Sequence, residues 1–460
     1  MNPIAALRRL LFRYGLYQLH GLFLVGICVL TVPSVFLLVV LNRSEELSLF
    51  RPKGPMWVSQ HGQGSGRVTP VERFRQRRQH FVDTCRMIGH AGEEDDGLSP
   101  LMRFENLTVC LPSKAGSTLF KMILHYLAEN KASLPNEQPF FQVQFGNVHE
   151  ELPKSLRAPR RGKLDGGGMK TAVFVRDPYT RLLFAYIDKL FRPRLDYWRT
   201  YGKPILTHVR GHEETDLSRM CASDVTFAEF IRYLVMSELE KKTKVSPHFY
   251  PISRQCGLCN EPENLSVVYD FIGKTETYAT DAPAILKAVG LYDRLPHDFD
   301  LGVAYRQRNM ELLVNYTFRR HLSEPLSTMC TSKAETLVRV WRILQIRGIF
   351  STSESFPFSN TSAEDVTYGQ FLQTSRAAFK RSLEDRSLSG NVNTAMKEAY
   401  STVPLADRKA LQRIFHRDFL LFQYPSSVPG VFPENDRFQL DRFHFFDVFH
   451  ERFKEKTAEL

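Results

Sequence analysis

The chain has 460 residues, of which 43% are hydrophobic, and this length limits it to one sizeable domain with appendages or to two small domains. The formal net charge is +11 and the sequence pI is about 9.2. Such a basic protein favours acidic partners, which are nucleic acid, an anionic membrane or an acidic polysaccharide. The charge does not choose among these three.

An apolar segment at Gly21–Leu41 is the first predicted element, and it contains no charged residue. At a rise of about 1.5 Å per residue, a helix of this length spans about 30 Å, the thickness of the hydrocarbon layer. A cleaved signal peptide would have a shorter apolar region and a small-residue cleavage site, so we predict a retained signal anchor. The flanking basic residues nearly balance, but the short arm at 1–20 and the long body predict a cytosolic N-terminus and a luminal body.

The body contains two features expected of a luminal chain. N-glycosylation sequons begin at Asn106, Asn264, Asn315 and Asn360, and a fifth, at Asn42, lies against the predicted membrane segment. Besides Cys28 in the apolar segment there is an even set of cysteines, which permits full disulfide pairing. These are Cys85, Cys110, Cys221, Cys256, Cys259 and Cys330.

Two of these cysteines, Cys256 and Cys259, form a CxxC motif. A structural zinc site would need a second pair of ligands beside this one, and the sequence has no second CxxC. We therefore expect a local disulfide between Cys256 and Cys259.

Composition along the chain predicts a stem, a globular domain and a tail. Residues 42–100 form the stem, because 51–70 is rich in Pro, Gly and Ser without apolar periodicity; its basic stretch Arg73–His80 is expected to be a helix lying over the domain. The domain covers 101–428 and includes a Ser-rich loop at 351–363. The tail, 429–460, carries phenylalanines at mostly helical spacing and is expected to dock as a helix.

Within the domain, short apolar runs alternate with helical patterns. The predicted strands are 107–111, 171–175 and 269–273, and the helical patterns after them cover 119–127, 179–190 and 282–289. Strands that alternate with helices predict an α/β layered fold with a parallel sheet.

The stretch LPSKAGSTLFK at 111–121 joins the first strand to the first helix. Amides at a helix N-terminus have no partner within the helix, and the helix dipole adds positive charge there. Small residues let an anion approach the backbone, Lys114 adds a full charge, and Ser117 and Thr118 add hydroxyl donors. The turn is therefore predicted to bind phosphate or sulfate, although a capped helix start would use the same residues. It is not a Walker A loop, because its lysine precedes the glycine.

Residues 113–120 resemble the Pro-Lys-x-Gly-Thr-Thr-x-Trp loop with which sulfotransferases hold their donor, 3′-phosphoadenosine 5′-phosphosulfate. The resemblance implies that Lys114 contacts the donor near the scissile bridge. The residues implied to wrap the 5′-phosphate are Ala115, Gly116, Ser117, Thr118 and Leu119. Ser113 stands where the family has Pro.

A second signature, FVRDPYTRLLFAYIDKLF at 174–191, resembles the 3′-phosphate segment FVRDPxxRLxSAxxxKF of the Golgi chondroitin and dermatan sulfotransferases. Arg176 is implied to bind the 3′-phosphate through paired guanidinium donors. The family has a Ser eight residues later, and Phe184 stands there in this chain, so one 3′-phosphate contact is either replaced or lost. A salt bridge between Arg176 and Asp177 is the structural alternative.

Three further stretches, at 245–259, 269–277 and 413–425, resemble later motifs of the same family in the same order. The chain between Thr277 and Arg413 looks longer than in those relatives. The resemblance implies a three-layer, P-loop-like fold with a central parallel sheet behind one transmembrane helix. It also implies sulfuryl transfer to a glycan hydroxyl by a single-pass type II Golgi membrane protein, with no metal and no nucleic acid.

The attacking sugar hydroxyl needs a general base with a pKa near neutrality. His149 is the first candidate, because it lies between the two donor motifs, where related glycan sulfotransferases place a base. His248 is the second, and Glu150 and Glu151 are further candidates. A basic loop of Arg157, Arg160, Arg161 and Lys163 would guide an acidic glycan acceptor or is simply solvated.

Two other functions share parts of this pattern. A Golgi glycosyltransferase would have the same membrane layout and a DxD metal site, for which Asp298-Phe-Asp300 is the one sequence match. A catalytically degenerate glycan-binding relative is the other, suggested by Phe184. Binding of the donor would separate an enzyme from such a relative.

Overall fold

The computed structural model describes residues 68–89, 101–129, 156, 169–211, 216–240, 246–256, 258–259, 269–296, 299, 301–441 and 443–449. The apolar segment Gly21–Leu41 lies outside them. No helix within these ranges is both long and apolar enough to cross a membrane.

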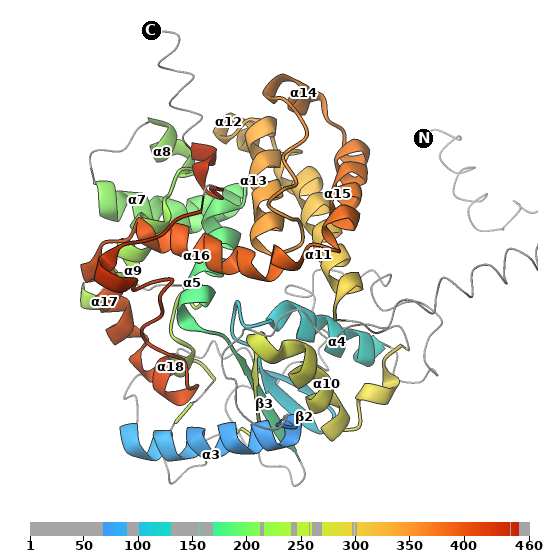
Figure 1. Cartoon of the computed structure of the whole chain (residues 1–460), viewed down its shortest axis with the longest axis vertical. Helices are drawn as coiled ribbons and strands as arrows, with labels where there is room; N and C mark the ends of the chain where they lie inside the picture. The colour runs from blue at the N-terminus through green and yellow to red at the C-terminus, as the bar shows by residue number, and fades with distance from the viewer. Residues whose placement is uncertain are drawn as a thin grey trace, which may run out of the picture. The chain divides into compact units, whose positions relative to one another are not determined.

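A four-stranded sheet forms the centre of the part that carries the donor motifs (Figure 1). Its strands, in spatial order, are β1 (Leu101–Phe104), β2 (Leu107–Cys110), β3 (Lys170–Val175) and β4 (Phe271–Lys274). β2, β3 and β4 run parallel, and β1 is antiparallel to β2. The predicted α/β alternation with a parallel sheet is thus confirmed. β1 is absent from the sequence-based prediction because it is a four-residue edge strand beside a polar turn.

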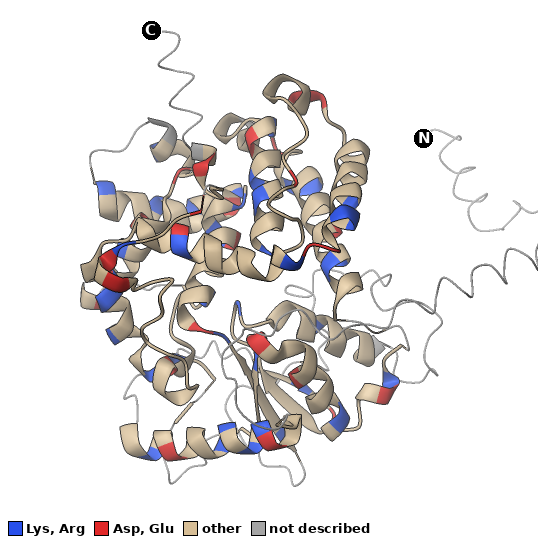
Figure 2. Ribbon diagram, in the orientation of Figure 1, with Lys and Arg blue, Asp and Glu red and all other residues tan. Residues whose placement is uncertain are grey.

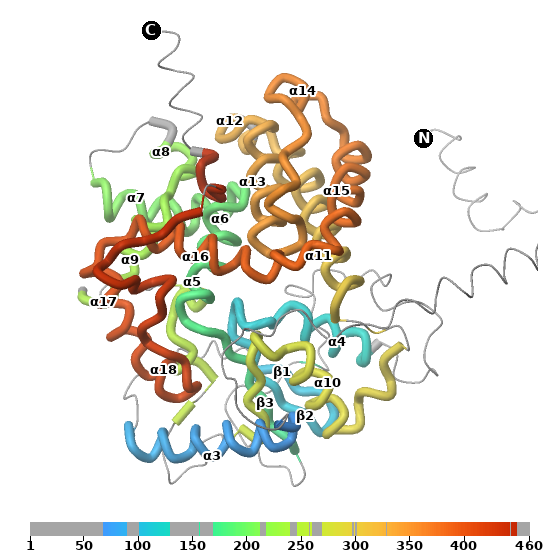
Figure 3. The backbone as a smooth tube through the Cα atoms, viewed as in Figure 1, coloured from blue at the N-terminus to red at the C-terminus, as the bar shows by residue number. Residues whose placement is uncertain are grey.

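Both faces of the sheet are buried, which explains why its parallel strands read as continuous apolar runs. Side chains of β3 alternate between the two faces: Ala172 and Phe174 share one apolar cluster with α4 and α10, whereas Val173 and Val175 pack in another with the segment around Ile252. Figure 3 shows α4 and α10 lying along the sheet. The sheet is therefore covered on both sides.

The helices that follow the strands agree with the predicted patterns. They are α4 (Ser117–Glu129), α5 (Pro178–Tyr186) and α10 (Tyr278–Ala288). α5 continues as a π-helical turn, η3 (Ile187–Phe191), so the end of the predicted helix is wider than an α-helix. π-Turns of this kind often occur at functional sites.

The predicted basic helix at 73–80 lies within α3 (Pro70–Ile88), whose charged residues are visible in Figure 2. Thr69 caps the first turn of α3, and Pro70 begins it without needing an amide donor. Arg73 and Arg77 reach the fully buried carboxylate of Asp281 on α10 at 2.6 and 2.7 Å. α3 is therefore fastened to the sheet domain.

A second, larger apolar core lies among helices that precede and follow β4 in the sequence. Their bounds are α6 (Leu195–Tyr197), η4 (Trp198–Gly202), α7 (Lys203–Arg210), α8 (Asp216–Cys221), α9 (Phe227–Glu240), α11 (Val303–Tyr316), η8 (Thr317–His321), α12 (Pro325–Cys330), α13 (Lys333–Ile346), α14 (Asn360–Asp365), α15 (Tyr368–Ser382), α16 (Asn391–Ser401), α17 (Leu405–Ile414) and α18 (His416–Leu421). The stretch between Thr277 and Arg413, which looks long by comparison with the family, supplies α10 to α16 and most of α17. The Ser-rich loop is correct up to Ser359, which caps α14, and wrong from Asn360, where that helix begins.

The cysteines pair across the fold. Cys85 of α3 bonds Cys259, and Cys110 at the end of β2 bonds Cys256. The predicted local disulfide between Cys256 and Cys259 is therefore wrong, because each of these neighbours faces a different partner. Cys221 of α8 bonds Cys330 of α12, so all six pair, as the even number allowed.

The C-terminal tail docks on the helical core, but its described residues contain no α-helix. They form two short 3₁₀ turns, η10 (Glu434–Asp436) and η11 (Asp447–Phe449), and Phe445 is fully buried. The amides of Phe445 and Phe446 donate to Glu398 of α16. The expected helix is wrong because these amides bind a side chain of another element instead of a carbonyl one turn earlier.

We expect the Cys221→Ser/Cys330→Ser double variant to lose about 2–5 kcal/mol of unfolding free energy, because the bond closes a long loop. Denaturant unfolding measured by circular dichroism would show this loss. The control is Met220→Ser, since Met220 is 46% exposed and next to Cys221. Equal stability of the double variant and the control would contradict a stabilising disulfide.

Candidate active site

The turn between β2 and α4 has two residues in the left-handed backbone region, Lys114 at φ 69° and Gly116 at φ 78°. A Cβ on Gly116 would lie 2.7 Å from the ring of Tyr278 on α10, so only glycine fits there. Lys114 adopts a conformation that is unfavourable for a side-chain-bearing residue. The turn is thus a specific shape that directs Lys114 and leads into the N-terminus of α4.

The ammonium of Lys114 binds the carboxylate of Asp188, with Nζ 2.5 Å from Oδ2. The other oxygen of Asp188 accepts a hydrogen bond from Arg347, which follows α13. The three side chains are each about one-fifth exposed. One carboxylate from η3 therefore bridges the turn and the helical core.

The charges around Lys114 and Asp188, including that of Arg347, shift the pKa values of both groups. Burial would raise the pKa of Asp188, but the cations of Lys114 and Arg347 lower it well below its usual range. Burial lowers the pKa of Lys114, and Asp188 opposes that lowering. Asp188 therefore stays ionised and helps Lys114 to stay protonated.

Arg176 follows the last residue of β3, and its Nε donates to Thr275 Oγ1 at 3.0 Å. Its guanidinium lies over the ring of Phe184, 4.5 Å from the ring centre. Phe184 thus supports the flat face of Arg176, where a hydroxyl was expected from the family pattern. The alternative pair with Asp177 does not form, because Asp177 instead caps α5 through the amide of Thr180.

Arg181, fully buried in α5, joins two motifs that are far apart in the sequence. Its Nε donates to the carbonyl of Ser113 at 3.0 Å, and one Nη donates to the carbonyls of Pro247 and His248 at 3.4 Å. Burial lowers the pKa of Arg181 to about 10, so its charge persists at neutral pH. The buried guanidinium holds the turn next to the segment that carries His248.

The charges of Lys114 and its neighbours affect the pKa of His248. Burial, followed by the cations of Lys189 and Lys114, lowers the pKa of its imidazole to about 2. Nδ1 shares a hydrogen bond with Ser246 Oγ at 3.0 Å, which leaves Nε2 as the nitrogen for chemistry. His149, Glu150 and Glu151 lie outside the described residues, as do the basic loop and the Asp298-Phe-Asp300 motif.

The structure therefore brings the turn 114–119, Arg176 and His248 to one region. Sequence reasoning missed Arg181 and Asp188 as site residues, although both stand inside the second signature. It also missed Arg347, for which no motif gives a signal. Arg347 and Asp188 are far apart in the sequence, so only the folded structure shows that they form an ion pair.

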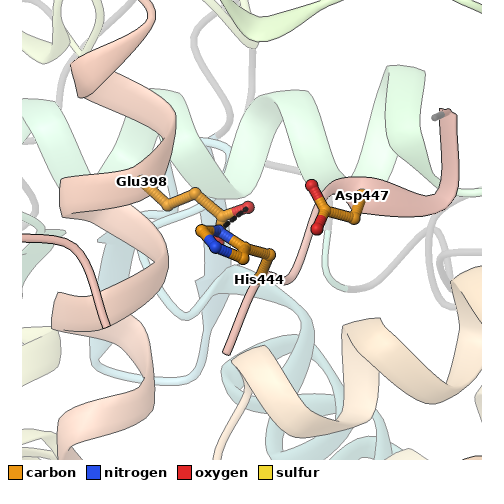
Figure 4. Close-up of side chains that lie close together, drawn as sticks. All are labelled: Glu398, His444 and Asp447. Atoms are coloured by element: carbon orange, nitrogen blue, oxygen red, sulfur yellow. Dashed lines mark ion pairs between the residues drawn. The ribbon is translucent and has the colours of Figure 1, made fainter. Parts of the chain in front are cut away.

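A different group of polar side chains offers ligand atoms to a metal ion. Glu398, His444 and Asp447 present one atom each within 4.8 Å of one another, and Figure 4 shows them converging between α16 and the tail. Glu398 already accepts the two tail amides, and His444 Nδ1 lies 3.9 Å from it. The described contacts of Glu398 serve tail docking.

Comparisons with known proteins agree with this geometry. A family model described as "Sulfotransferase family" matches residues 103–342, more than half of the chain. Carbohydrate sulfotransferase 12 of Xenopus laevis is 27% identical over 43% of this chain and 49% of its own length. Carbohydrate sulfotransferase 8 of Mus musculus is 30% identical over 54% and 56%, and carbohydrate sulfotransferase 14 of Danio rerio is 39% identical over 26% and 29%.

The fold is thus that of an α/β protein with a lysine turn before a helix and an arginine at the end of the neighbouring parallel strand. The chain belongs to the sulfotransferase family, and the curated relatives cited are carbohydrate sulfotransferases. It spans about half the length, or less, of these relatives. No solved structure matches it significantly.

We expect the half-buried, neutral His248 to make the protein less stable in acid. The unfolded chain binds a proton on this ring near its ordinary pKa of about 6.5, whereas the folded chain does so only near 2, so stability falls as pH drops below about 6.5. Urea unfolding at pH 7 and pH 5 measures this. His248→Gln should lose less stability over that interval than the parent, and equal losses would contradict the assignment.

Proposed function

We propose that this protein transfers a sulfuryl group from 3′-phosphoadenosine 5′-phosphosulfate to a hydroxyl of an acidic glycan. We further propose that it acts in the Golgi lumen, as a single-pass type II membrane protein anchored by Gly21–Leu41. The observation that carries the proposal is the meeting of Lys114 and Arg176 at one edge of the parallel sheet. β2 and β3 are paired and parallel, so the turn after one and the arginine after the other leave the sheet at the same edge.

The residues present fit the two phosphate groups of such a donor. The turn supplies small residues, a helix N-terminus and Lys114 for the 5′-phosphosulfate. Arg176, with its face supported by Phe184 and its Nε on Thr275, retains its Nη groups to donate to the 3′-phosphate. The expected Ser contact is thus replaced by ring stacking that orients the guanidinium.

The reaction needs charge stabilisation and a proton acceptor. The donor supplies a sulfuryl group activated by its bond to phosphate. The acceptor oxygen forms a bond to sulfur while the sulfur–oxygen bond to the phosphate breaks, and the hydroxyl proton passes to a base. Lys114 stabilises the charge that develops on the departing phosphate oxygen. Asp188 keeps the ammonium charged, and Arg347 helps to hold Asp188 in place.

Two histidines are candidates for the base. His149 is proposed from its place between the donor motifs, and His248 from its contacts beside Lys114. In the structure, burial and nearby cations make His248 a weak base. The negative charge of a donor bound at Lys114 would oppose that effect, so His248 would become a stronger base only when the donor is present.

Calorimetry of the purified full-length chain with phosphoadenosine phosphate tests the donor site. Saturable binding supports the proposal, and no heat of binding at millimolar ligand would refute it in favour of a degenerate relative. Transfer of radiolabelled sulfate to chondroitin, dermatan, heparan and terminal-glucuronyl acceptors would then identify the acceptor.

Lys114→Ala is expected to lower sulfate transfer at least about 100-fold, because one preorganised charge at the leaving oxygen is lost. The variant also loses the ion pair with Asp188, so its melting temperature should fall, and activity is compared at a temperature at which circular dichroism shows it folded. Lys380→Ala, at an exposed position of α15, is the matched control. Full activity of Lys114→Ala would contradict the role given to this lysine.

A further inference from the structure

Two cations next to the Lys114–Asp188 pair have no carboxylate partner in the described parts of the chain. Lys189 of η3 is 5% exposed, and its Nζ lies 3.7 Å from the centre of the Tyr197 ring. Arg192, just after η3, stacks on Tyr316 of α11 with 4.3 Å between Cζ and the ring centre. Its buried Nε has no hydrogen-bond acceptor among the residues that the structure describes. Both side chains are thus positioned by aromatic rings, not by ion pairs.

The charges around them do not balance. Counting only residues that the structure describes, five cations interact here with two carboxylates, which gives a net charge of +3 when all are ionised. They are Lys114, Lys189, Arg192, Arg194 and Arg347 against Asp188 and Asp196. Asp188 serves Lys114 and Arg347, and Asp196 pairs with Arg194. Within the described ranges, Lys189 and Arg192 form no ion pair of their own, although the charge of Asp188 raises the pKa of both.

Such an arrangement is costly unless an anion completes it. A buried charge without a partner is unfavourable, and the penalty falls when an oppositely charged ligand binds. Burial lowers the pKa of Lys189 to about 7 and that of Arg192 to about 10, because the cost of desolvation exceeds the attraction of Asp188. The rings fix both side chains in advance, so a ligand would lose little entropy in ordering them.

The donor already has cations for its two phosphate groups, since Lys114 serves the 5′ end and Arg176 the 3′ end. Lys189 lies in the π-turn η3, and Arg192 follows it. Arg176 instead stacks on Phe184 of α5. With the whole 5′-phosphosulfate, its sulfuryl group included, assigned to Lys114 and the turn amides, the acceptor is the remaining source of an anion for these two cations.

We propose that Lys189 and Arg192 form an anion subsite beside Lys114 that binds a carboxylate or sulfate group of the acceptor glycan. This rests on the proposed function, because it assigns the anion to a glycan acceptor. The subsite selects acceptors that carry a negatively charged group close to the reacting hydroxyl. This is one specific role for the positive charge of the protein. Electrostatic selection of this kind discriminates against neutral glycans more than it raises total affinity.

Equilibrium binding of three fluorescent hexasaccharides to the full-length chain tests the subsite. The probes are sulfated chondroitin, its desulfated form, and a desulfated form with its carboxylates reduced to alcohols. The parent should bind the first or second probe at least about ten-fold more tightly than the neutral third one. The probe that loses affinity tells whether sulfate or carboxylate is the recognised group.

Arg192→Gln and Lys189→Gln should each remove most of that preference and leave both neutral-probe binding and phosphoadenosine phosphate binding unchanged. Arg192→Lys should keep part of it, because the charge remains. Arg319→Gln, at an exposed cation of η8, should behave as the parent, and unfolding temperatures check that each variant folds.

Several results would overturn the subsite. They are a parent without preference for the anionic probes, a variant that keeps the full preference, and a variant that weakens neutral-probe binding equally. Weaker phosphoadenosine phosphate binding by Arg192→Gln would assign these cations to the donor. If the parent itself fails to bind phosphoadenosine phosphate, the proposed sulfotransfer fails, and anionic preference would then be a property of a glycan-binding protein.

Discussion

The carboxylate of Asp188 holds three distant parts of the chain at one point. It binds Lys114 from the turn before α4 and Arg347 from the end of α13, and it belongs to the π-turn after α5. A single anion between two cations stays ionised at any ordinary pH. Because the turn, the π-turn and the helical core share this group, none of them can move far without breaking it.

The parallel sheet provides the frame for that group. Pairing of β2 with β3 sends the lysine turn and Arg176 to the same edge, and the buried guanidinium of Arg181 ties the turn to the segment of His248. Disulfides between Cys110 and Cys256 and between Cys85 and Cys259 fasten that segment to β2 and α3. Each motif of the sequence is thus held by a contact to another motif.

Phe184 supports the guanidinium of Arg176 by stacking, although it lacks the hydroxyl expected at this position from the family pattern. A hydroxyl at this position would donate one hydrogen bond to an anion, whereas the ring lies flat under Arg176 and limits its rotation. In the proposed donor site, the ring that orients Arg176 would take the place of the hydroxyl contact. Lys189 and Arg192 lie in the same way over the rings of Tyr197 and Tyr316. Three cations of this region are thus positioned by aromatic rings.

The sequence by itself determined the alternation of strands and helices, the lysine turn and the arginine after the second strand. These depend on local periodicity and on neighbours within a few residues, which one reads directly from the chain. Only the tertiary structure decided the pairing of the cysteines, the non-helical docking of the tail and the contacts of Arg181. It also decided that Arg347 reaches Asp188 across 159 positions of sequence. Such partners are chosen by packing and by the need to neutralise buried charge, and neither leaves a pattern in the local sequence.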